Sequence, residues 1–149
     1  MSEVVLFGAT GYTGGLTARA MVRRGLTPVL AGRNVAALGA VARDLGGLTV
    51  RRADAADPAS VRGAVKAGDV LVSTVGPFAR HGQAALDAAL AVGAHYIDST
   101  GEPAFIRRVF EQHRRAQAGG IALLTAFGYD YVPGNTAAAA ALARAGPRA

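Results

Sequence analysis

The chain contains no cysteine and no tryptophan, and Lys66 is the only lysine among its 16 basic residues. Without cysteine there can be no disulfide and no thiolate metal site, and its three histidines lack the close spacing of a histidine-built metal site. No apolar run approaches the ~20 residues of a membrane-spanning helix. The N-terminus also lacks the basic stretch and apolar core of a secretory signal. We therefore expect a cytoplasmic protein with no membrane span and no metal.

The composition is that of one compact globular domain with a basic surface. The chain has 149 residues, of which 51% are hydrophobic, enough to bury a sizeable core. The formal net charge is +6, almost all of it from arginine. Such an excess suits an anionic ligand, either a phosphate or a nucleic acid. Glycine is also abundant, with 20 residues, and its positions are informative.

Short β-branched runs alternate with alanine-rich helical patterns along the whole chain. We predict strands at residues 3–7, 27–31, 48–52, 69–75, 95–98 and 121–127. We predict helices at residues 13–24, between the Asn34 cap and Gly46, and at 58–67, 82–92, 103–118 and 136–145. This alternation indicates a parallel sheet covered on both faces. Right-handed crossovers then favour a doubly wound Rossmann fold, a three-layer α/β/α domain over residues 1–149 with strand order 3-2-1-4-5-6.

A glycine-rich loop follows the first predicted strand and reads Gly-Ala-Thr-Gly-Tyr-Thr-Gly over residues 8–14. Gly8 permits a tight turn, Gly11 lets the backbone approach phosphates, and Gly14 allows close packing of helix on sheet. The N–H groups at the helix start can bind the anion, and the two threonines can add hydroxyl donors. The predicted cofactor-binding residues of this loop are Gly8, Thr10, Gly11, Tyr12, Thr13 and Gly14.

The spacing of these glycines is G-x-x-G-x-x-G rather than the G-x-G-x-x-G of the standard dinucleotide fingerprint. The departure favours a loop of the NADP or short-chain-reductase type. It is not a phosphate-binding Walker loop, because no Gly-Lys-Ser/Thr follows. The alternative is a glycine-rich turn that binds no ligand.

The end of the second strand distinguishes NADP from NAD. An NAD enzyme usually has an acidic residue there to hold the ribose hydroxyls, but this chain has Arg33 followed by Asn34. The Arg33 guanidinium can pair with a 2′-phosphate and stack on adenine, and Asn34 can donate through its amide. We therefore expect NADP or NADPH as the cofactor. Alternatively, Arg33 is solvated and Asn34 is only a helix cap.

Two further segments are candidates for the same site. Asp54 follows the third strand and can accept from the adenine amine, although an ordinary turn role fits as well. The fourth strand ends beside the topological switch point, where ligands bind. The predicted contacts to ribose and nicotinamide there are Thr74, Val75, Gly76, Pro77 and Phe78. Phe78 either walls the site or packs beneath the loop.

No catalytic acid or base can be assigned. No tyrosine is followed four residues later by a lysine, so the Tyr-x-x-x-Lys pair of short-chain dehydrogenases is absent. His81 can reach a substrate, but a solvated histidine at a helix start is the simpler interpretation. Tyr96 and Asp98 share one face of a strand and fit a structural hydrogen-bond network. Tyr129 and Asp130 are equally plausible candidates.

The predicted helix at 103–118 has an arginine-rich side and an apolar side. Arg107 and Arg108 recur seven residues later as Arg114 and Arg115. A solvated basic face is the default interpretation, and a nucleic-acid surface lacks the interleaved aromatic residues it needs, so we do not expect nucleic acid as a partner. The apolar side is either core or a homodimer surface and consists of Phe105, Ile106, Val109 and Phe110.

Taken together, the segments GATGYTG, AGRN, VGPF, HYIDSTGE and GYDYVPGN resemble the NADP-binding domain of saccharopine dehydrogenase-like oxidoreductases. That group includes the trans-acting enoyl reductases. The resemblance implies a Rossmann fold, NADP chemistry, and cofactor roles for Gly8, Gly11, Gly14, Arg33 and the 74–78 loop.

The chain departs from the family in length. Members carry a second α/β domain that shapes the substrate site, and we expect that domain to be absent here, whether the chain is an excised domain or a natural short form. Residues 128–133 would then lie at the domain junction. The substrate, a small molecule or a lipid-like compound, stays unidentified.

Three functional hypotheses follow. The first is an oxidoreductase domain that binds NADP(H) and presents nicotinamide for hydride transfer, weakly active or inactive alone. The second is a non-catalytic NADP-sensing regulator similar to NmrA-like proteins, which share a GATGxxG loop. The third is a DNA-binding module that uses the arginine face, whose affinity would fall steeply with salt.

Overall fold

A computed structural model describes residues 2–146. Its centre is one six-stranded sheet whose strand pairs are all parallel, in the order β3-β2-β1-β4-β5-β6. The strands are β1 (Val4–Phe7), β2 (Val29–Gly32), β3 (Val50–Arg52), β4 (Val70–Ser73), β5 (His95–Asp98) and β6 (Leu123–Leu124). The predicted Rossmann topology is confirmed.

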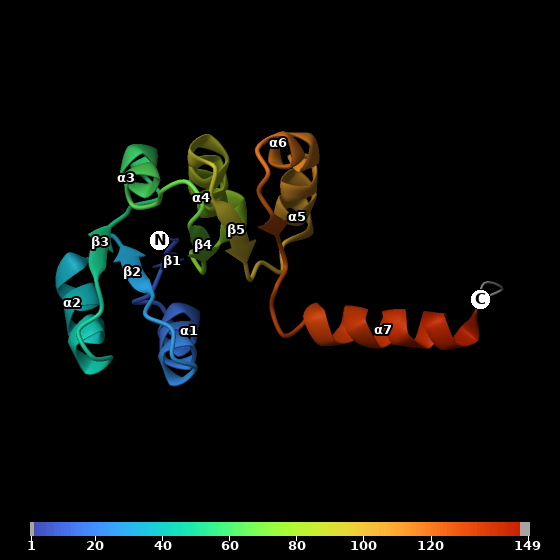
Figure 1. The fold of residues 1–149 in the computed structure, drawn as a ribbon, viewed down its shortest axis with the longest axis horizontal. Coiled ribbons are helices and arrows are strands. Elements are labelled where there is room, and N and C mark those ends of the chain that lie inside the picture. The colour runs from blue at the N-terminus through green and yellow to red at the C-terminus, as the bar shows by residue number, and fades with distance from the viewer. Residues whose placement is uncertain (1, 147–149) are drawn as a thin grey trace.

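Helices cover both faces of the sheet (Figure 1). They are α1 (Tyr12–Arg23), α2 (Val35–Asp44), α3 (Pro58–Gly63), α4 (Phe78–Val92), α5 (Pro103–Phe110), α6 (His113–Ala118) and α7 (Val132–Ala145). In β1, Leu6 packs with α1 and α2, whereas Val5 and Phe7 pack with α3, α4 and α5. Alternate residues of a strand point to opposite faces, so β1 contributes to both halves of the core.

Several element boundaries differ from the prediction, and two of these differences follow from contacts between distant residues. Helix α4 begins at Phe78, four residues before the predicted start, and the Glu102 carboxylate accepts hydrogen bonds from the backbone at that point. Strand β6 ends at Leu124 because Asp98 Oδ1 accepts from both Thr125 Oγ1 and the Ala126 N–H, which turns the chain out of the sheet.

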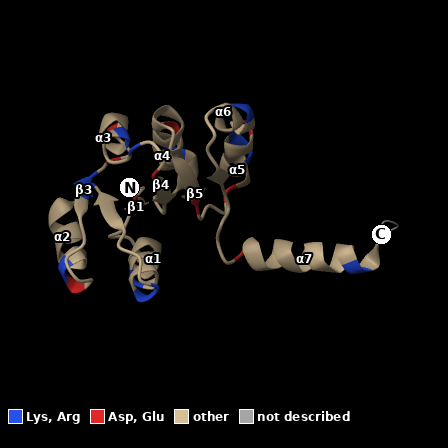
Figure 2. Cartoon of the chain, viewed as in Figure 1, with Lys and Arg blue, Asp and Glu red and all other residues tan. Residues whose placement is uncertain are grey.

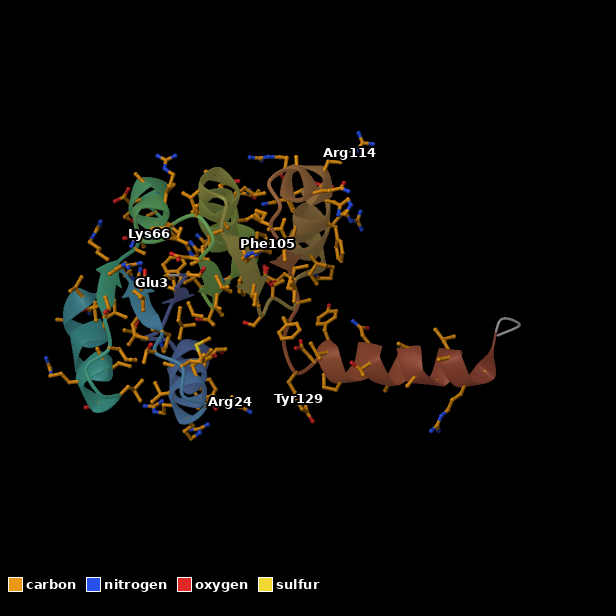
Figure 3. All side chains as sticks on the ribbon, in the orientation of Figure 1. Glu3, Arg24, Lys66, Phe105, Arg114 and Tyr129 are labelled. Atoms are coloured by element: carbon orange, nitrogen blue, oxygen red, sulfur yellow. The ribbon has the colours of Figure 1, made fainter. Side chains whose placement is uncertain are left out.

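The predicted helix at 103–118 is two helices. It breaks at residues 111–112, where the Gln112 N–H bonds to the Val109 carbonyl instead of continuing the α-helical pattern. The seven-residue arginine repeat therefore does not form one continuous helix side. Figure 2 shows basic residues spread over several helices, α1 and α6 among them, and Figure 3 shows Arg114 pointing outward.

The apolar side of that segment is divided between core and surface. Phe105 and Val109 are buried in the main core, whereas Phe110 is 70% exposed. The core interpretation therefore holds for Phe105 and Val109.

Helix α7 extends away from the sheet and its flanking helices (Figure 1). It begins at Val132, before the predicted Thr136, and none of its residues is buried. No helix in residues 2–146 is both long enough and apolar enough to span a membrane.

Candidate cofactor site

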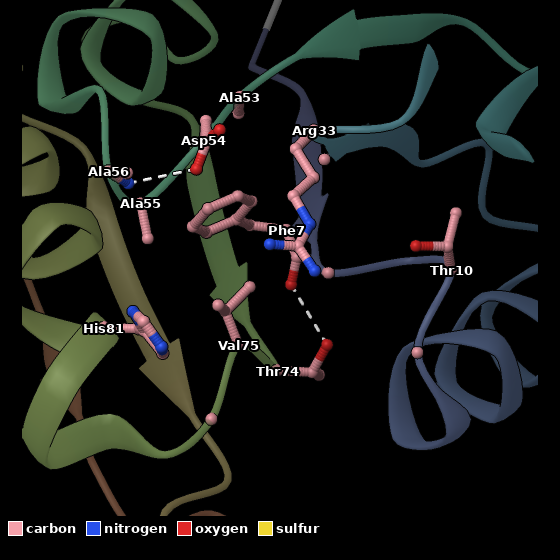
Figure 4. A pocket seen from close by; sticks show the side chains of 14 residues that line it. Phe7, Thr10, Arg33, Ala53, Asp54, Ala55, Ala56, Thr74, Val75 and His81 are labelled. Atoms are coloured by element: carbon pink, nitrogen blue, oxygen red, sulfur yellow. Dashed lines mark hydrogen bonds between the residues drawn. The ribbon is translucent and has the colours of Figure 1, made fainter. Parts of the chain in front are cut away.

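A cavity of about 300 Å³ lies at the carboxyl ends of the four strands β1 to β4 (Figure 4). Each strand delivers its following loop to the cavity wall. The lining residues are Phe7, Gly8, Thr10, Gly11, Gly32, Arg33, Ala53, Asp54, Ala55, Ala56, Thr74, Val75, Gly76 and His81. This edge includes the point between β1 and β4 where the strand order reverses, which is where doubly wound sheets bind their ligands.

Gly8 closes the turn at the centre of this cavity. Its φ is +94°, and a Cβ there would lie 2.7 Å from Thr74 Oγ1 and 2.9 Å from Val75 Cγ2. The Gly8 N–H donates to the Ala31 carbonyl at 2.9 Å, and Thr74 Oγ1 donates to the Phe7 carbonyl at 3.0 Å. Both the backbone conformation and the available space therefore require glycine at this position.

The start of α1 is open to an anion. Its N-cap residue, Gly11, offers no side-chain acceptor, and the first turn contains no acidic residue. By contrast, Asn34 caps α2 and Asp57 caps α3, while Glu102 accepts from the first N–H groups of α4. The first N–H groups of α1 thus lack such a protein acceptor, and with the helix dipole they favour a phosphate.

Arg33 extends over the cavity from the end of β2 (Figure 4). In residues 2–146 the ion pairs are formed by Arg51, Arg52 and Lys66, so the Arg33 guanidinium is available for an external anion. Asp54 faces Arg33 across the cavity, and its Oδ1 accepts from the Ala56 N–H at 3.0 Å. The turn interpretation of Asp54 is therefore correct, and the same side chain also reaches the cavity wall.

Eight of the fourteen predicted site residues line the cavity. They are Gly8, Thr10, Gly11, Arg33, Asp54, Thr74, Val75 and Gly76.

The other six lie outside the lining and have visible structural roles or exposed positions. Gly14 packs against the Gly8 carbonyl, and Asn34 Oδ1 caps α2 by accepting from the Ala37 N–H. Pro77 is the N-cap residue of α4, and Phe78 is buried with its ring 5.6 Å from that of Phe105. Tyr12 and Thr13 open α1 with exposed side chains.

His81 is the lining residue of most chemical interest among those that were not assigned to the site. Its half-buried imidazole points toward the cavity from the first turn of α4 (Figure 4). The sequence favoured a solvated histidine at a helix start, but the side chain is half-buried and lines the cavity. Phe7, Gly32, Ala53, Ala55 and Ala56 also line the cavity, and their apolar or absent side chains carry no sequence signal for a ligand.

Tyr96 and Asp98, considered as catalytic candidates, are both sealed in the interior. Burial raises the pKa of the Tyr96 phenol well above its usual range, and the nearby Asp98 carboxylate adds to this effect. Asp98 Oδ1 is occupied by the Thr100 N–H, Thr125 Oγ1 and the Ala126 N–H. The structural-network interpretation therefore holds for Asp98, whereas the buried Tyr96 hydroxyl has no hydrogen-bond partner among the described residues. Neither side chain is accessible for proton transfer with a substrate.

Tyr129 and Asp130, the other two catalytic candidates, lie outside this cavity. Tyr129 is 91% exposed, and Asp130 is also exposed on the segment that leads to α7. Neither lines the cavity at the strand ends. Within residues 2–146 no cluster of three or more histidine, aspartate or glutamate side chains is arranged to hold a metal ion.

The fold and the site define a dinucleotide-binding domain of the Rossmann class. The defining features are the doubly wound sheet, the uncapped start of α1 behind a glycine turn, and the free arginine at the end of β2. The model of the saccharopine dehydrogenase NADP-binding domain matches residues 4–124. The chain belongs to this family of NADP-binding domains.

Known proteins agree with this assignment. The chain is 35% identical over 140 residues to a trans-acting enoyl reductase of Mycobacterium ulcerans, covering 89% of this chain and 34% of that protein. It thus spans about a third of the length of the curated relatives it matches.

Solved structures agree in fold. The apo saccharopine dehydrogenase (L-Glu forming) of Saccharomyces cerevisiae superposes with a TM-score of 0.71 at 19% identity, over 87% of this chain and 28% of that one. The Citrobacter sp. triphenylmethane reductase complexed with NADP(H) superposes with a TM-score of 0.65 at 19% identity, over 83% of this chain and 48% of that one.

Proposed function

We propose that this chain holds NADP(H) along the carboxyl edge of its sheet and presents the nicotinamide for hydride transfer in a longer oxidoreductase. The observation that carries the proposal is the cavity that joins the open start of α1 to the unpaired Arg33 guanidinium. The substrate, a small molecule or a lipid-like compound, would be held by a second domain. This chain is the cofactor-binding part of that proposed enzyme.

The residues fit the cofactor in three parts. Arg33 would pair with the 2′-phosphate, and the Asp54 carboxylate, whose second oxygen has no partner in the described hydrogen bonds, would accept from the adenine amine. The pyrophosphate would lie on the backbone at Gly8 and Gly11, and a larger residue at position 8 would displace the neighbouring Thr74 and Val75. The loop at residues 74–76 would contact the ribose and nicotinamide half.

The bound cofactor would supply the hydride, and the chain would supply its position. The Thr74 hydroxyl is already committed as a donor to the Phe7 carbonyl, so it would fix the loop rather than move a proton. Among the catalytic candidates in residues 2–146, His81 alone lines the cavity. The proton donor would be either His81 or a group in the substrate-holding part of the enzyme.

Calorimetric titration of the 149-residue chain tests the cofactor assignment. NADPH should bind tightly and NADH at least about tenfold more weakly, and 2′,5′-ADP should compete with NADPH. No binding of either dinucleotide would overturn the proposal. A hydride-exchange assay between NADPH and an oxidised nicotinamide analogue then asks whether the nicotinamide is presented. Hydride exchange would exclude the non-catalytic NADP-sensing regulator, whereas tight binding without exchange fits both hypotheses, because the chain alone is expected to be weakly active or inactive.

A further inference from the structure

The carboxylate of Glu102, in the loop after β5, accepts hydrogen bonds from the first backbone N–H groups of α4. Its Oε1 accepts from the Phe78 N–H at 2.6 Å and its Oε2 accepts from the Ala79 N–H at 2.8 Å. Glu102 is more than twenty residues away in sequence, in the loop between β5 and α5. This two-oxygen contact satisfies two of the four helix N–H groups that have no intrahelical partner, and charged acceptors make the stronger hydrogen bonds.

The backbone of Glu102 is held by hydrogen bonds that begin at Asp98, the last residue of β5. Asp98 Oδ1 accepts from the Thr100 N–H at 3.0 Å, and Thr100 Oγ1 accepts from the Glu102 N–H at 3.1 Å. Asp98 and Thr100 are each 1% exposed. Two linked hydrogen bonds, the first buried and the second partly buried, therefore lead from the end of β5 to the Glu102 backbone and hold it in place.

The start of α4 is also where the cavity loop ends. Thr74, Val75 and Gly76 line the cavity, and Pro77 joins them to Phe78. The other end of the loop is held by Thr74, whose N–H and hydroxyl both donate to the Phe7 carbonyl. Glu102 thus anchors the far end of a short loop whose near end is tied to β1.

We infer that Glu102 is a positioning residue for the nicotinamide half of the cofactor, acting through the backbone of residues 78–79 on the loop at residues 74–77. The inference rests on the proposed function. The carboxylate also neutralises the positive end of the α4 dipole, so phosphates are directed to the uncapped start of α1 instead. The loops after β2 and β3, which line the other side of the cavity, would hold the adenine half, and that half should not depend on Glu102.

The test compares two ligands in Glu102→Ala and Glu102→Gln. NADPH contains the nicotinamide half, whereas 2′,5′-ADP lacks it. We expect Glu102→Ala to weaken NADPH binding about tenfold and to leave 2′,5′-ADP binding within about twofold. Glu102→Gln keeps one acceptor oxygen and should recover part of the NADPH affinity. The exposed Glu111→Gln removes the same charge from the C-terminal end of α5 and serves as the control.

A readout without cofactor checks the anchoring step. Amide hydrogen exchange of Phe78 and Ala79 should accelerate in Glu102→Ala, while that of core β1 residues should not. Equal weakening of both ligands would mean that Glu102 only supports the fold, and no change in either would mean that the loop does not need it. Both outcomes overturn the inference. A wild-type chain that binds neither ligand would instead overturn the proposed function on which the inference rests.

Discussion

Gly14 in α1 rests directly on the carbonyl group of Gly8: a Cβ atom on Gly14 would lie 2.1 Å from that oxygen. Gly14 is buried, and Gly8 lines the cofactor cavity. The contact sets how closely the first turn of α1 approaches the turn after β1. The same pair therefore links the packing of helix on sheet to the shape of the phosphate site.

Replacing Gly14 with alanine should force α1 away from the sheet. The new methyl group meets backbone atoms, which cannot rotate aside, so we expect the free energy of unfolding to fall by about 1–3 kcal/mol. Urea unfolding followed by circular dichroism measures this change. Gly39→Ala is the matched control, because a Cβ at Gly39 in α2 would meet only the end of Arg43 at 3.9 Å. That variant should gain up to about 1 kcal/mol from helix propensity, and equal losses in both variants would contradict the argument.

Arg33→Ala should remove the preference for NADPH. Charge-assisted hydrogen bonds to a phosphate contribute about 1.5–3 kcal/mol, so NADPH affinity should fall about 10- to 100-fold. NADH lacks the 2′-phosphate, and its affinity should barely change. Titration of both dinucleotides measures the two effects. Arg43→Ala removes an exposed arginine from the end of the neighbouring helix α2 and should change neither affinity; a parallel loss of NADPH and NADH would rule out a 2′-phosphate contact.

Much of the fold and part of the site could be predicted from local sequence. The alternation of apolar strands with capped helices fixes a parallel doubly wound sheet, and caps such as Asn34 and Asp57 are visible within a few residues of the helices they start. Gly8 and Gly14 sit at the required places because the backbone there has no room for a Cβ. These features depend on residues close together in the chain.

The features that could not be predicted depend on residues far apart in the chain. The early start of α4 requires a carboxylate from Glu102, and the early end of β6 requires the buried side chain of Asp98. The direction of His81 follows from that early helix start. No window along the sequence contains both partners of these contacts, so propensity alone placed the boundaries incorrectly.

Gly82 and Phe105 should behave as a coupled pair. A Cβ on Gly82 in α4 would lie 2.6 Å from the fully buried ring of Phe105 in α5. We expect Gly82→Ala to lower the free energy of unfolding by about 1–3 kcal/mol. In a Phe105→Leu background the smaller side chain leaves room for the methyl group, so the same change should cost less there. The two measurements form a double-mutant cycle with a coupling of at least about 0.5 kcal/mol, and simple additivity would show that the helices separate instead.

The surface ion pair between Asp57 and Arg52 should make the free energy of unfolding depend on pH in the acid range. Its Oδ2 lies 3.1 Å from Arg52 Nη1, and its Oδ1 accepts from the Ser60 N–H at the start of α3. The Arg52 hydrogen bond, helped by the Ser60 N–H, lowers the pKa of Asp57 below its usual 3.8. A carboxyl whose pKa is depressed on folding stabilises the folded state fully above its unfolded pKa, and that contribution is lost as the pH falls through the folded pKa.

The stability difference between the wild type and Asp57→Asn should therefore shrink on acidification. Asparagine is also a good N-cap residue, so this variant removes the charge while keeping a cap. Urea unfolding of both proteins should be measured between about pH 6 and about pH 3. The wild type should have the larger free energy of unfolding at the higher pH values, and the two free energies should become equal below pH 3.8, the usual pKa of this carboxyl. Added salt should reduce the difference at the upper end, because the pair is solvent-exposed. A difference that stays constant or grows with acid would mean that the Arg52 contact does not stabilise the folded chain.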